Sequence, residues 1–227
     1  LDEALAELAP RIPRGVETRA SALSGSDATV RILGFPRAAL RQAEAAIRIE
    51  LEGQLPFEAS EAVLDHMLLS QPGADPASLL VAVARTDTVR ALVDLLGRHG
   101  LDPEALAVGA LPLLHLVPRG HALLSEDGVC ILDMGRAETD LAVLCGGRPA
   151  FLRSFRVGAE DLTRAIAKTF RVPRGEAEAV KVTRLTLEGD PAAHHEPSMR
   201  ALVEDAQGGL ASLLGPLRRT LVELRAR

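Results

Sequence analysis

The 227-residue sequence contains no tryptophan and no tyrosine, and it has five phenylalanines. A hydrophobic core must therefore be built mainly from Leu, Val, Ala and Ile side chains. No apolar run approaches the roughly 20 residues of a transmembrane helix, and no stretch has the charged, apolar and small-residue order of a signal peptide. The sequence thus predicts a soluble globular chain that is long enough to bury a core.

Basic residues are fewer than acidic ones, and the formal net charge is −5. A nucleic-acid partner would require a concentrated basic face, so we expect no nucleic acid. Cysteine is also scarce. Cys130 and Cys145 lie in apolar runs typical of strands, without CxxC spacing, and we predict that both are reduced core residues of a cytosolic protein.

Catalytic and metal-binding patterns are equally scarce. His194 and His195 adjoin Glu196, but neighbouring side chains in a loop seldom converge on one ion, so we predict no metal site. No Ser, His and Asp arrangement stands out, and no nucleophile follows a recognisable elbow. We therefore expect a protein that is not an enzyme.

Apolar periodicity and turn residues predict helices and strands in both halves of the chain. Helices are expected at 1–8, 36–53, 88–100, 158–170 and 174–185 and from about 199 to the end; strands at 15–25, 28–35, 61–70, 78–85, 128–135, 139–147 and 148–157. The first two strands flank the turn residues Gly25, Ser26 and Asp27. This mixture indicates an α/β protein with two lobes that meet near residue 120.

Three motifs follow one another between residues 133 and 181. Asp133, Gly135, Thr139 and Asp140 match the pattern D-x-G-G-G-T-T-D, Leu162, Thr163, Ile166 and Ala167 match L-T-x-x-I-A, and Ala177, Glu178 and Lys181 match A-E-x-x-K. In this order and spacing they resemble the second lobe of the actin-like ATPase superfamily. The branch concerned holds the cell-division protein FtsA, the pilus assembly protein PilM and the type II secretion protein GspL.

The first half agrees with this resemblance. Residues 40–66 resemble the helix, Pro-Phe turn and strand that open a small insert subdomain in PilM and GspL, and residues 79–106 resemble the return to the first lobe. The resemblance implies a two-lobed actin-like α/β fold with a small α+β insert subdomain. Residues 1–35 and 86–120 would be the remainder of the first lobe, 36–85 the insert subdomain and 121–227 the second lobe.

The chain begins at Leu1 rather than Met. The resemblance places a first phosphate turn before it and an adenosine turn after it, so we expect a piece that is truncated at both ends. Strands 15–25 and 28–35 would then lack neighbours, and we expect another copy, a partner strand or a swapped segment to cover their edge. A homodimer is therefore one expectation.

The turn at residues 133–140 departs from the family pattern. A turn that cradles phosphate needs glycine, because positive φ is then cheap and no side chain stands between amide and oxygen. Arg136 and Ala137 occupy the two glycine positions, and Glu138 replaces a small residue. We interpret the turn as a degenerate phosphate site in which Arg136 and Glu138 form a solvated pair. The alternative is that the Arg136 guanidinium itself binds phosphate.

Glu178 and Lys181 are three residues apart on one helix face. The resemblance implies that they hold a ribose, and the alternative is a surface ion pair worth a few tenths of a kcal/mol. The residues assigned to a degenerate nucleotide site are Asp133, Gly135, Arg136, Thr139, Glu178 and Lys181.

Two functions follow from the resemblance. The first is a non-catalytic cytoplasmic scaffold of a type II secretion system, without a cofactor, that docks the secretion ATPase to the inner-membrane platform. The alternative is a PilM-like pilus assembly protein that binds ATP with magnesium and the amino-terminal peptide of a membrane partner. In both, the partners are a secretion or pilus ATPase and inner-membrane assembly proteins. The chain would reach the membrane through these partners or through a segment outside it.

Overall fold

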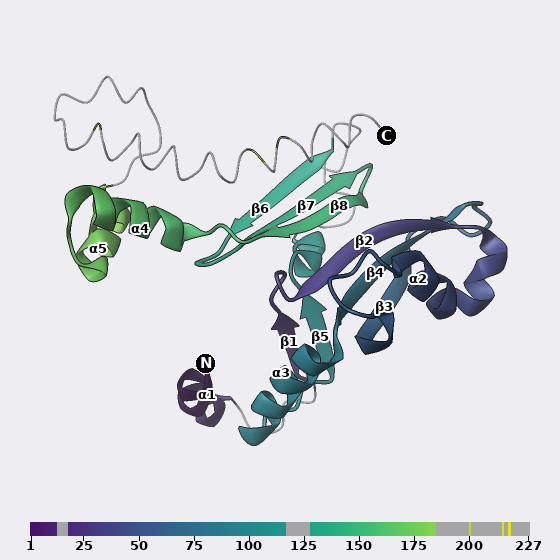
Figure 1. The fold of residues 1–227 in the computed structure, drawn as a ribbon, viewed down its shortest axis with the longest axis horizontal. Helices are drawn as coiled ribbons and strands as arrows, with labels where there is room; N and C mark the ends of the chain where they lie inside the picture. The colour runs from purple at the N-terminus through teal and green to yellow at the C-terminus, as the bar shows by residue number, and fades with distance from the viewer. Residues whose placement is uncertain (13–17, 117–127, 185–199, 201–214, 216–217, 219–227) are drawn as a thin grey trace. The chain divides into compact units, whose positions relative to one another are not determined.

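The computed structural model describes residues 1–12, 18–116 and 128–184, and the isolated helical positions 200, 215 and 218 (Figure 1). The mixture of helices and strands confirms the α/β class. Described residues within Leu1–Ile131 and Leu141–Ser154 form one compact unit, and those within Leu132–Asp140 and Phe155–Arg227 form a second. The lobe boundaries expected from the family resemblance stay a prediction. The lobe junction near residue 120, the loop with His194 and His195, and nearly all of the last expected helix lie outside the described residues.

A three-stranded antiparallel sheet is the framework of the first unit. Its order is β2–β4–β3, with β2 at Ala28–Phe35, β3 at Ala62–Leu68 and β4 at Ala77–Arg85. Residues 79–84 of the central strand β4 are all apolar, which suits a strand with both faces covered. Successive side chains of a strand point to opposite faces, so Leu79 and Val81 enter one core and Leu80 enters another.

A short helix covers one face of this sheet (Figure 1). The sequence predicts one helix over 36–53, whereas the structure has a 3-10 helix, η2, at Arg37–Gln42, followed by α2 at Ala43–Leu51. The change falls at Gln42, whose φ of −134° and ψ of 47° are not α-helical. On α2, Ile47 and Leu51 are fully buried in the core beside Phe35 and Val81.

The second core lies against the opposite face of β4. Leu80 packs there with Leu113 of η4 (Leu111–His115) and with Ala142 and Leu152 from two later strands. After β4 the chain enters the amphipathic helix α3, Thr86–Arg98, which buries Leu96. Gly100 follows with φ +67°, a conformation that glycine adopts without strain.

Strand β1, Ala20–Leu23, lies within the expected strand at 15–25. It pairs in parallel with β5, Ala105–Val108, whereas β2 pairs with β4. Strand β5 is not predicted from the sequence. The expectation that a second copy covers a first-lobe edge stays a prediction. The amino-terminal helix α1, Asp2–Leu8, buries Leu5, and its Asp2 carboxylate lies 2.8 Å from His99 Nε2.

The last described strands and helices agree with the sequence. Strands β6 (Val129–Met134), β7 (Thr139–Cys145) and β8 (Arg148–Phe155) form a sheet in that order, and helices α4 (Ala159–Phe170) and α5 (Arg174–Arg184) follow. Gly146 and Gly147, with φ of +56° and +74°, make the tight turn between β7 and β8. Helices α4 and α5 pack side by side (Figure 1).

The two cysteines are free and lie in strands, as expected, but they are not core residues. Cys130 alternates along β6 with the half-buried Val129 and Ile131, so its side chain is on the exposed side of the strand. Cys145 is the exposed last residue of β7. An apolar run therefore did not imply burial at these two positions.

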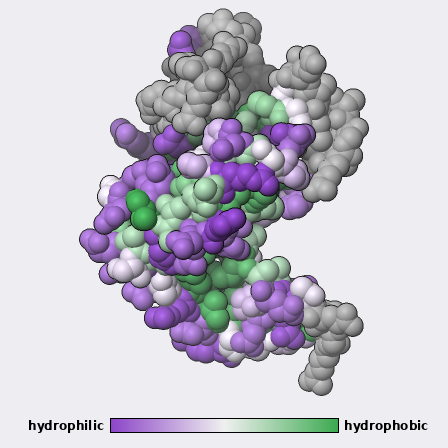
Figure 2. Space-filling model, turned by 90° about the vertical axis from the view of Figure 1, so that its right-hand side faces the viewer, coloured by the Kyte–Doolittle hydropathy of each residue, from purple (hydrophilic) through white to green (hydrophobic). Residues whose placement is uncertain are grey.

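The surface mixes apolar and charged side chains. On the face in Figure 2, apolar groups are interrupted by hydrophilic ones. Exposed large apolar residues include Ile49 on α2, Val63, Met67 and Leu68 on β3, and Val182 on α5. Among the helices that the structure describes, none combines the length and apolar character that crossing a bilayer requires.

Candidate functional site

The candidate turn between β6 and β7 is tight. The Gly135 N–H donates to the Glu138 carbonyl at 2.9 Å, so Arg136 and Ala137 form the tip. Asp133, at the end of β6, and Gly135 are exposed, as is the tip. The turn and the two helices after it belong to the second compact unit.

The turn is bonded to the start of α4. The Ala159 N–H donates to the Gly135 carbonyl at 2.9 Å, and the Glu160 N–H donates to the Arg136 carbonyl at 2.8 Å. The first amides of a helix have no partner within the helix and often bind anions. Here two of them are already occupied by the turn's own carbonyl oxygens.

Gly158 allows this close approach. A Cβ on Gly158 would lie 2.5 Å from the Arg136 carbonyl oxygen and 2.7 Å from the Ala137 nitrogen. Its φ of −150° is ordinary extended backbone, so the glycine is required by space and not by conformation. Its N–H donates to Asp161 Oδ2 at 2.9 Å, which closes the first turn of α4.

Arg136 has a different partner from the one predicted. The sequence suggests a pair with Glu138, but the ion pair that the structure gives Arg136 is with Glu160, from Nε to Oε2 at 3.2 Å. Arg174, at the start of α5, donates to both oxygens of the same carboxylate through Nε and Nη2. These hydrogen bonds, first from Arg174 and then from Arg136, lower the pKa of Glu160 to about 2.

Thr139 is fully buried, and its hydroxyl donates to the Val157 carbonyl at 2.6 Å. The hydroxyl therefore ties the first residue of β7 to the chain that leads into α4. The role of this contact is structural, because the hydroxyl proton of Thr139 is donated to the Val157 carbonyl and is not available for a hydrogen bond to phosphate. Asp140, next to it, is half-buried.

Glu178 and Lys181 form an ion pair, with Nζ 2.8 Å from Oε2. The pair is not a simple surface contact. Lys181 Nζ also donates to the Thr163 hydroxyl at 2.9 Å and to the Ala159 carbonyl at 3.3 Å, and its side chain is 15% exposed. The Thr163 hydroxyl lies 2.6 Å from Glu178 Oε2. Hydrogen bonds from Lys181 and then Thr163 lower the pKa of Glu178, so this network joins α5 to α4.

The six predicted site residues thus fall into two neighbouring groups, the turn with α4 and the pair on α5. Whether they form a degenerate nucleotide site stays a prediction. Sequence reasoning missed Glu160, which binds Arg136 of the turn, and Arg174, which binds the same Glu160 carboxylate. An acidic residue in the first turn of a helix was the available signal for Glu160. Among the described residues, no group of three His, Cys, Asp or Glu side chains is placed to hold a metal ion.

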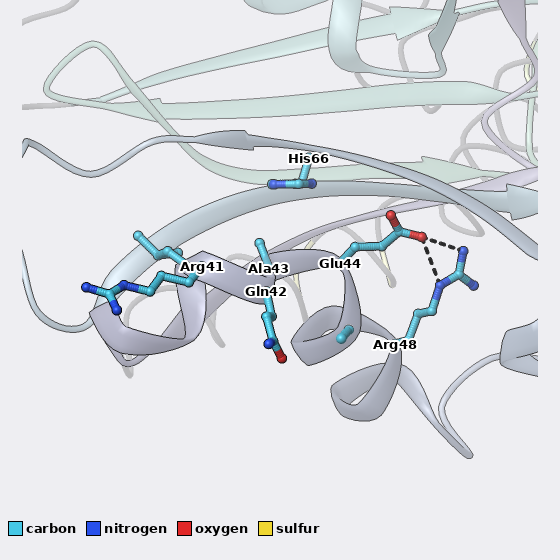
Figure 3. Close-up of a pocket in the computed structure, with 8 residues that line it drawn as sticks. Arg41, Gln42, Ala43, Glu44, Arg48 and His66 are labelled. Atoms are coloured by element: carbon cyan, nitrogen blue, oxygen red, sulfur yellow. Dashed lines mark hydrogen bonds and ion pairs between the residues drawn. The ribbon is translucent and has the colours of Figure 1, made fainter.

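A second feature is a hollow of about 620 Å³ in the first unit. Its lining comes from η2, α2 and β3: Leu40, Arg41, Gln42, Ala43, Glu44, Ala45, Arg48 and His66. Figure 3 shows His66 reaching toward the helical segment from the strand, while Glu44 turns toward Arg48.

Arg48 fixes one end of the hollow. Its guanidinium is bound to Glu44 Oε1 at 2.9 Å, and Nη1 donates to the Ala59 carbonyl at 2.7 Å and the Ala62 carbonyl at 3.2 Å. The residue therefore holds α2 to the start of β3, and the hollow lies between elements that are joined by these bonds.

A family model described as type IV pilus assembly protein PilM matches residues 1–204. The chain is similar to a solved chain of a "PilM-PilN type IV pilus biogenesis complex", with 28% identity and a TM-score of 0.76, over 99% of this chain and 64% of that one. This likeness confirms the actin-like fold expected from the three motifs.

Two further likenesses are more partial or more distant. FtsA of Escherichia coli K12 is 28% identical over 110 residues, which is 47% of this chain and 25% of that protein. The cytoplasmic domain of EpsL, an inner-membrane component of the Vibrio cholerae type II secretion system, is 18% identical with a TM-score of 0.48, over 91% of this chain and 80% of that chain. The chain spans about a quarter of the FtsA sequence and just under two thirds of the solved PilM chain.

Proposed function

This chain belongs to the family of the type IV pilus assembly protein PilM, and from that membership we propose that it is an adaptor that holds a membrane-anchored pilus assembly protein through a peptide contact. The supporting observation is its similarity, over 99% of its length, to a PilM chain that was solved in a complex with PilN. In this proposal the chain works at the cytoplasmic side of the inner membrane, where the pilus ATPase is a further partner.

This proposal replaces the type II secretion scaffold, which was the first of the two functions expected from the sequence. The family that matches most of the chain is the pilus family. The motifs of the second half are shared by both kinds of protein, and for that reason they could not decide between them.

The hollow between α2 and β3 is the docking groove in this proposal. Strand β3 is the last strand of the order β2–β4–β3 in the described sheet, so one of its edges faces away from β4. An extended peptide can add to such an edge through main-chain hydrogen bonds and place alternate side chains in adjacent pockets. The hollow beside His66 is a pocket of this kind.

The lining suggests what kind of peptide fits. Leu40, Ala43 and Ala45 supply apolar surface, and Glu44 and Arg48 neutralise each other. Further along β3, Leu68 is 48% exposed and shares a face with His66, because the two are separated by one residue. An extended, mainly aliphatic segment would bury this surface, and we assign that role to the amino-terminal segment of the membrane partner.

We propose in addition that the chain catalyses no reaction. Arg136 and Glu138 place large charged side chains at positions where the family's phosphate turn has small residues. A glutamate within about 4 Å of phosphate would repel it by roughly 4 kcal/mol at an effective dielectric constant near 20. A protein of this kind would act through protein contacts alone.

Peptide binding to two variants with one added arginine tests the groove. Ala45 is an exposed residue of α2 that lines the hollow, and Ala45→Arg would fill the groove without disturbing the core. We expect this variant to bind a labelled amino-terminal peptide of the PilN-type protein of the same organism roughly tenfold more weakly than the unchanged chain, a loss of about 1.4 kcal/mol. Fluorescence anisotropy would measure the dissociation constants.

The matched control is Ala91→Arg, which makes the same change at an exposed position of α3 that does not line the hollow. It should bind the peptide as the unchanged chain does. Equal weakening by both variants would mean that the effect is one of charge and not of the groove. If the unchanged chain does not bind the peptide, the proposed partner is wrong.

A further inference from the structure

Two arginines from separate elements meet at one carboxylate in the second unit. Arg136 comes from the tip of the β6–β7 turn and Arg174 from the start of α5, and both bind Glu160 in the first turn of α4. The Glu160 side chain is 20% exposed, whereas those of Arg136 and Arg174 are 75% and 56% exposed. The anion is thus sheltered between two cations that solvent can reach.

This arrangement has the form of an anion site that is already filled. A guanidinium fork binds carboxylate and phosphate with the same planar geometry, and Arg174 uses it here on both oxygens of Glu160. Arg136 adds a third hydrogen bond to Oε2. An incoming phosphate would have to take these donors from Glu160 while it is repelled by the same carboxylate.

We propose that Glu160 is an internal substitute for an anionic ligand, which engages Arg136 and Arg174 and keeps the turn closed to phosphate groups. The backbone supports the same closed state, because the carbonyl oxygens of Gly135 and Arg136 accept the first amides of α4. The first amides of α4 and the guanidinium groups of Arg136 and Arg174 thus have acceptors within the protein, without a bound ligand. This device is independent of the peptide groove, which is built from residues of the first unit.

Glu160→Gln tests the proposal, because it removes the charge and keeps the size of the side chain. The probe is inorganic pyrophosphate, titrated into the full chain at neutral pH and followed by calorimetry. We expect the unchanged chain to bind it with a dissociation constant above about 1 mM, and Glu160→Gln to bind at least tenfold more tightly. Adding Arg136→Gln and Arg174→Gln to this variant should abolish the gain.

The matched control is Glu3→Gln, which removes an exposed glutamate from the first turn of α1. It lowers the negative charge of the chain equally and should leave pyrophosphate binding unchanged. A second variant, Glu160→Asp, keeps the charge but shortens the side chain by one methylene. It should bind pyrophosphate with an affinity between those of the unchanged chain and Glu160→Gln, so the test survives if the glutamine variant does not fold.

Two outcomes would overturn the proposal. In one, neither Glu160 variant binds pyrophosphate more tightly than the unchanged chain. In the other, the gain persists after both arginines are removed, which would show that Glu160 repels anions from the surface in general and does not block an arginine site.

Discussion

Gly158 is the point at which the β6–β7 turn and helix α4 touch. Any Cβ there would overlap backbone atoms of Arg136 and Ala137, which cannot move as a flexible side chain end can. We expect Gly158→Ala to lower the free energy of unfolding by about 1–3 kcal/mol, the usual range for an overpacked site. Urea unfolding followed by circular dichroism would measure the change.

Gly175 offers the comparison for this prediction. It lies in the first turn of α5, and a Cβ added there meets no atom within 4 Å. Gly175→Ala should therefore leave stability unchanged or raise it by up to about 1 kcal/mol, since alanine costs less entropy in a helix than glycine. Equal destabilisation by the two alanines would show that the contact at Gly158 is not the cause.

Glu160 also predicts a dependence on pH. Its folded pKa of about 2 is lower than the 4.5 of an unpaired glutamate. A group with a lowered folded pKa contributes stability above its unfolded pKa, and this contribution is lost as pH falls toward the folded pKa. The unchanged chain should therefore lose more stability than Glu160→Gln between about pH 5 and pH 2. Urea midpoints at several pH values would show parallel curves for the two proteins if Glu160 were unpaired in solution.

The strands differ in how firmly their backbones are held. Strand β4 pairs through residues 77–84 with β2 on one side and through residues 79–85 with β3 on the other, and most of its side chains are buried. Strands β1 and β5 pair over four residues each, and no residue of β5 is fully buried. Amide exchange slows with burial and with bonding on both sides. Hydrogen exchange with mass spectrometry should show protection of 77–85 persisting longest, and earlier exchange in 20–23 and 105–108. The reverse order would contradict this account of the sheets.

Elements with a local signal were predictable from the sequence. The apolar run of β4, the paired glycines after β7 and the amphipathic pattern of α4 each act within a few residues. Strand β5 was missed because its four residues follow Pro103 and Glu104, and its partner β1 lies about eighty positions earlier. A parallel pair of this kind leaves no local pattern to read.

In the candidate site, too, contacts between residues close in sequence could be predicted, and contacts between distant residues could not. Its motif positions could be read from spacing alone, and so could the pairing of Glu178 with Lys181. The partner of Arg136 could not, because Glu160 lies 24 residues further on and reaches the turn only when α4 packs against it. The prediction that Cys130 is buried was wrong for a related reason, because the sequence of a strand does not say which of its faces is covered.

At the scale of the whole molecule, the family and the fold are known from two different comparisons. The family match over residues 1–204 gives the protein its class, and the solved PilM chain gives it the actin-like fold. Neither fixes the chemistry of the turn, where Arg136 and Glu138 depart from the family motif. The departure and the Glu160 contacts are properties of this chain's own residues.

The second unit takes its residues from two separate stretches of the chain, 132–140 and the part after 154. This has a consequence for the order of events during synthesis. Thr139 bonds to a carbonyl 18 residues later, and Arg136 pairs with a carboxylate 24 residues later. At roughly 5–20 residues per second, the turn leaves the ribosome about one to five seconds before its partners. Until Gly158 and α4 are synthesised, the turn's carbonyl groups can bond only to water, and all residues of the β7–β8 hairpin leave the ribosome before the partners of the turn that precedes it.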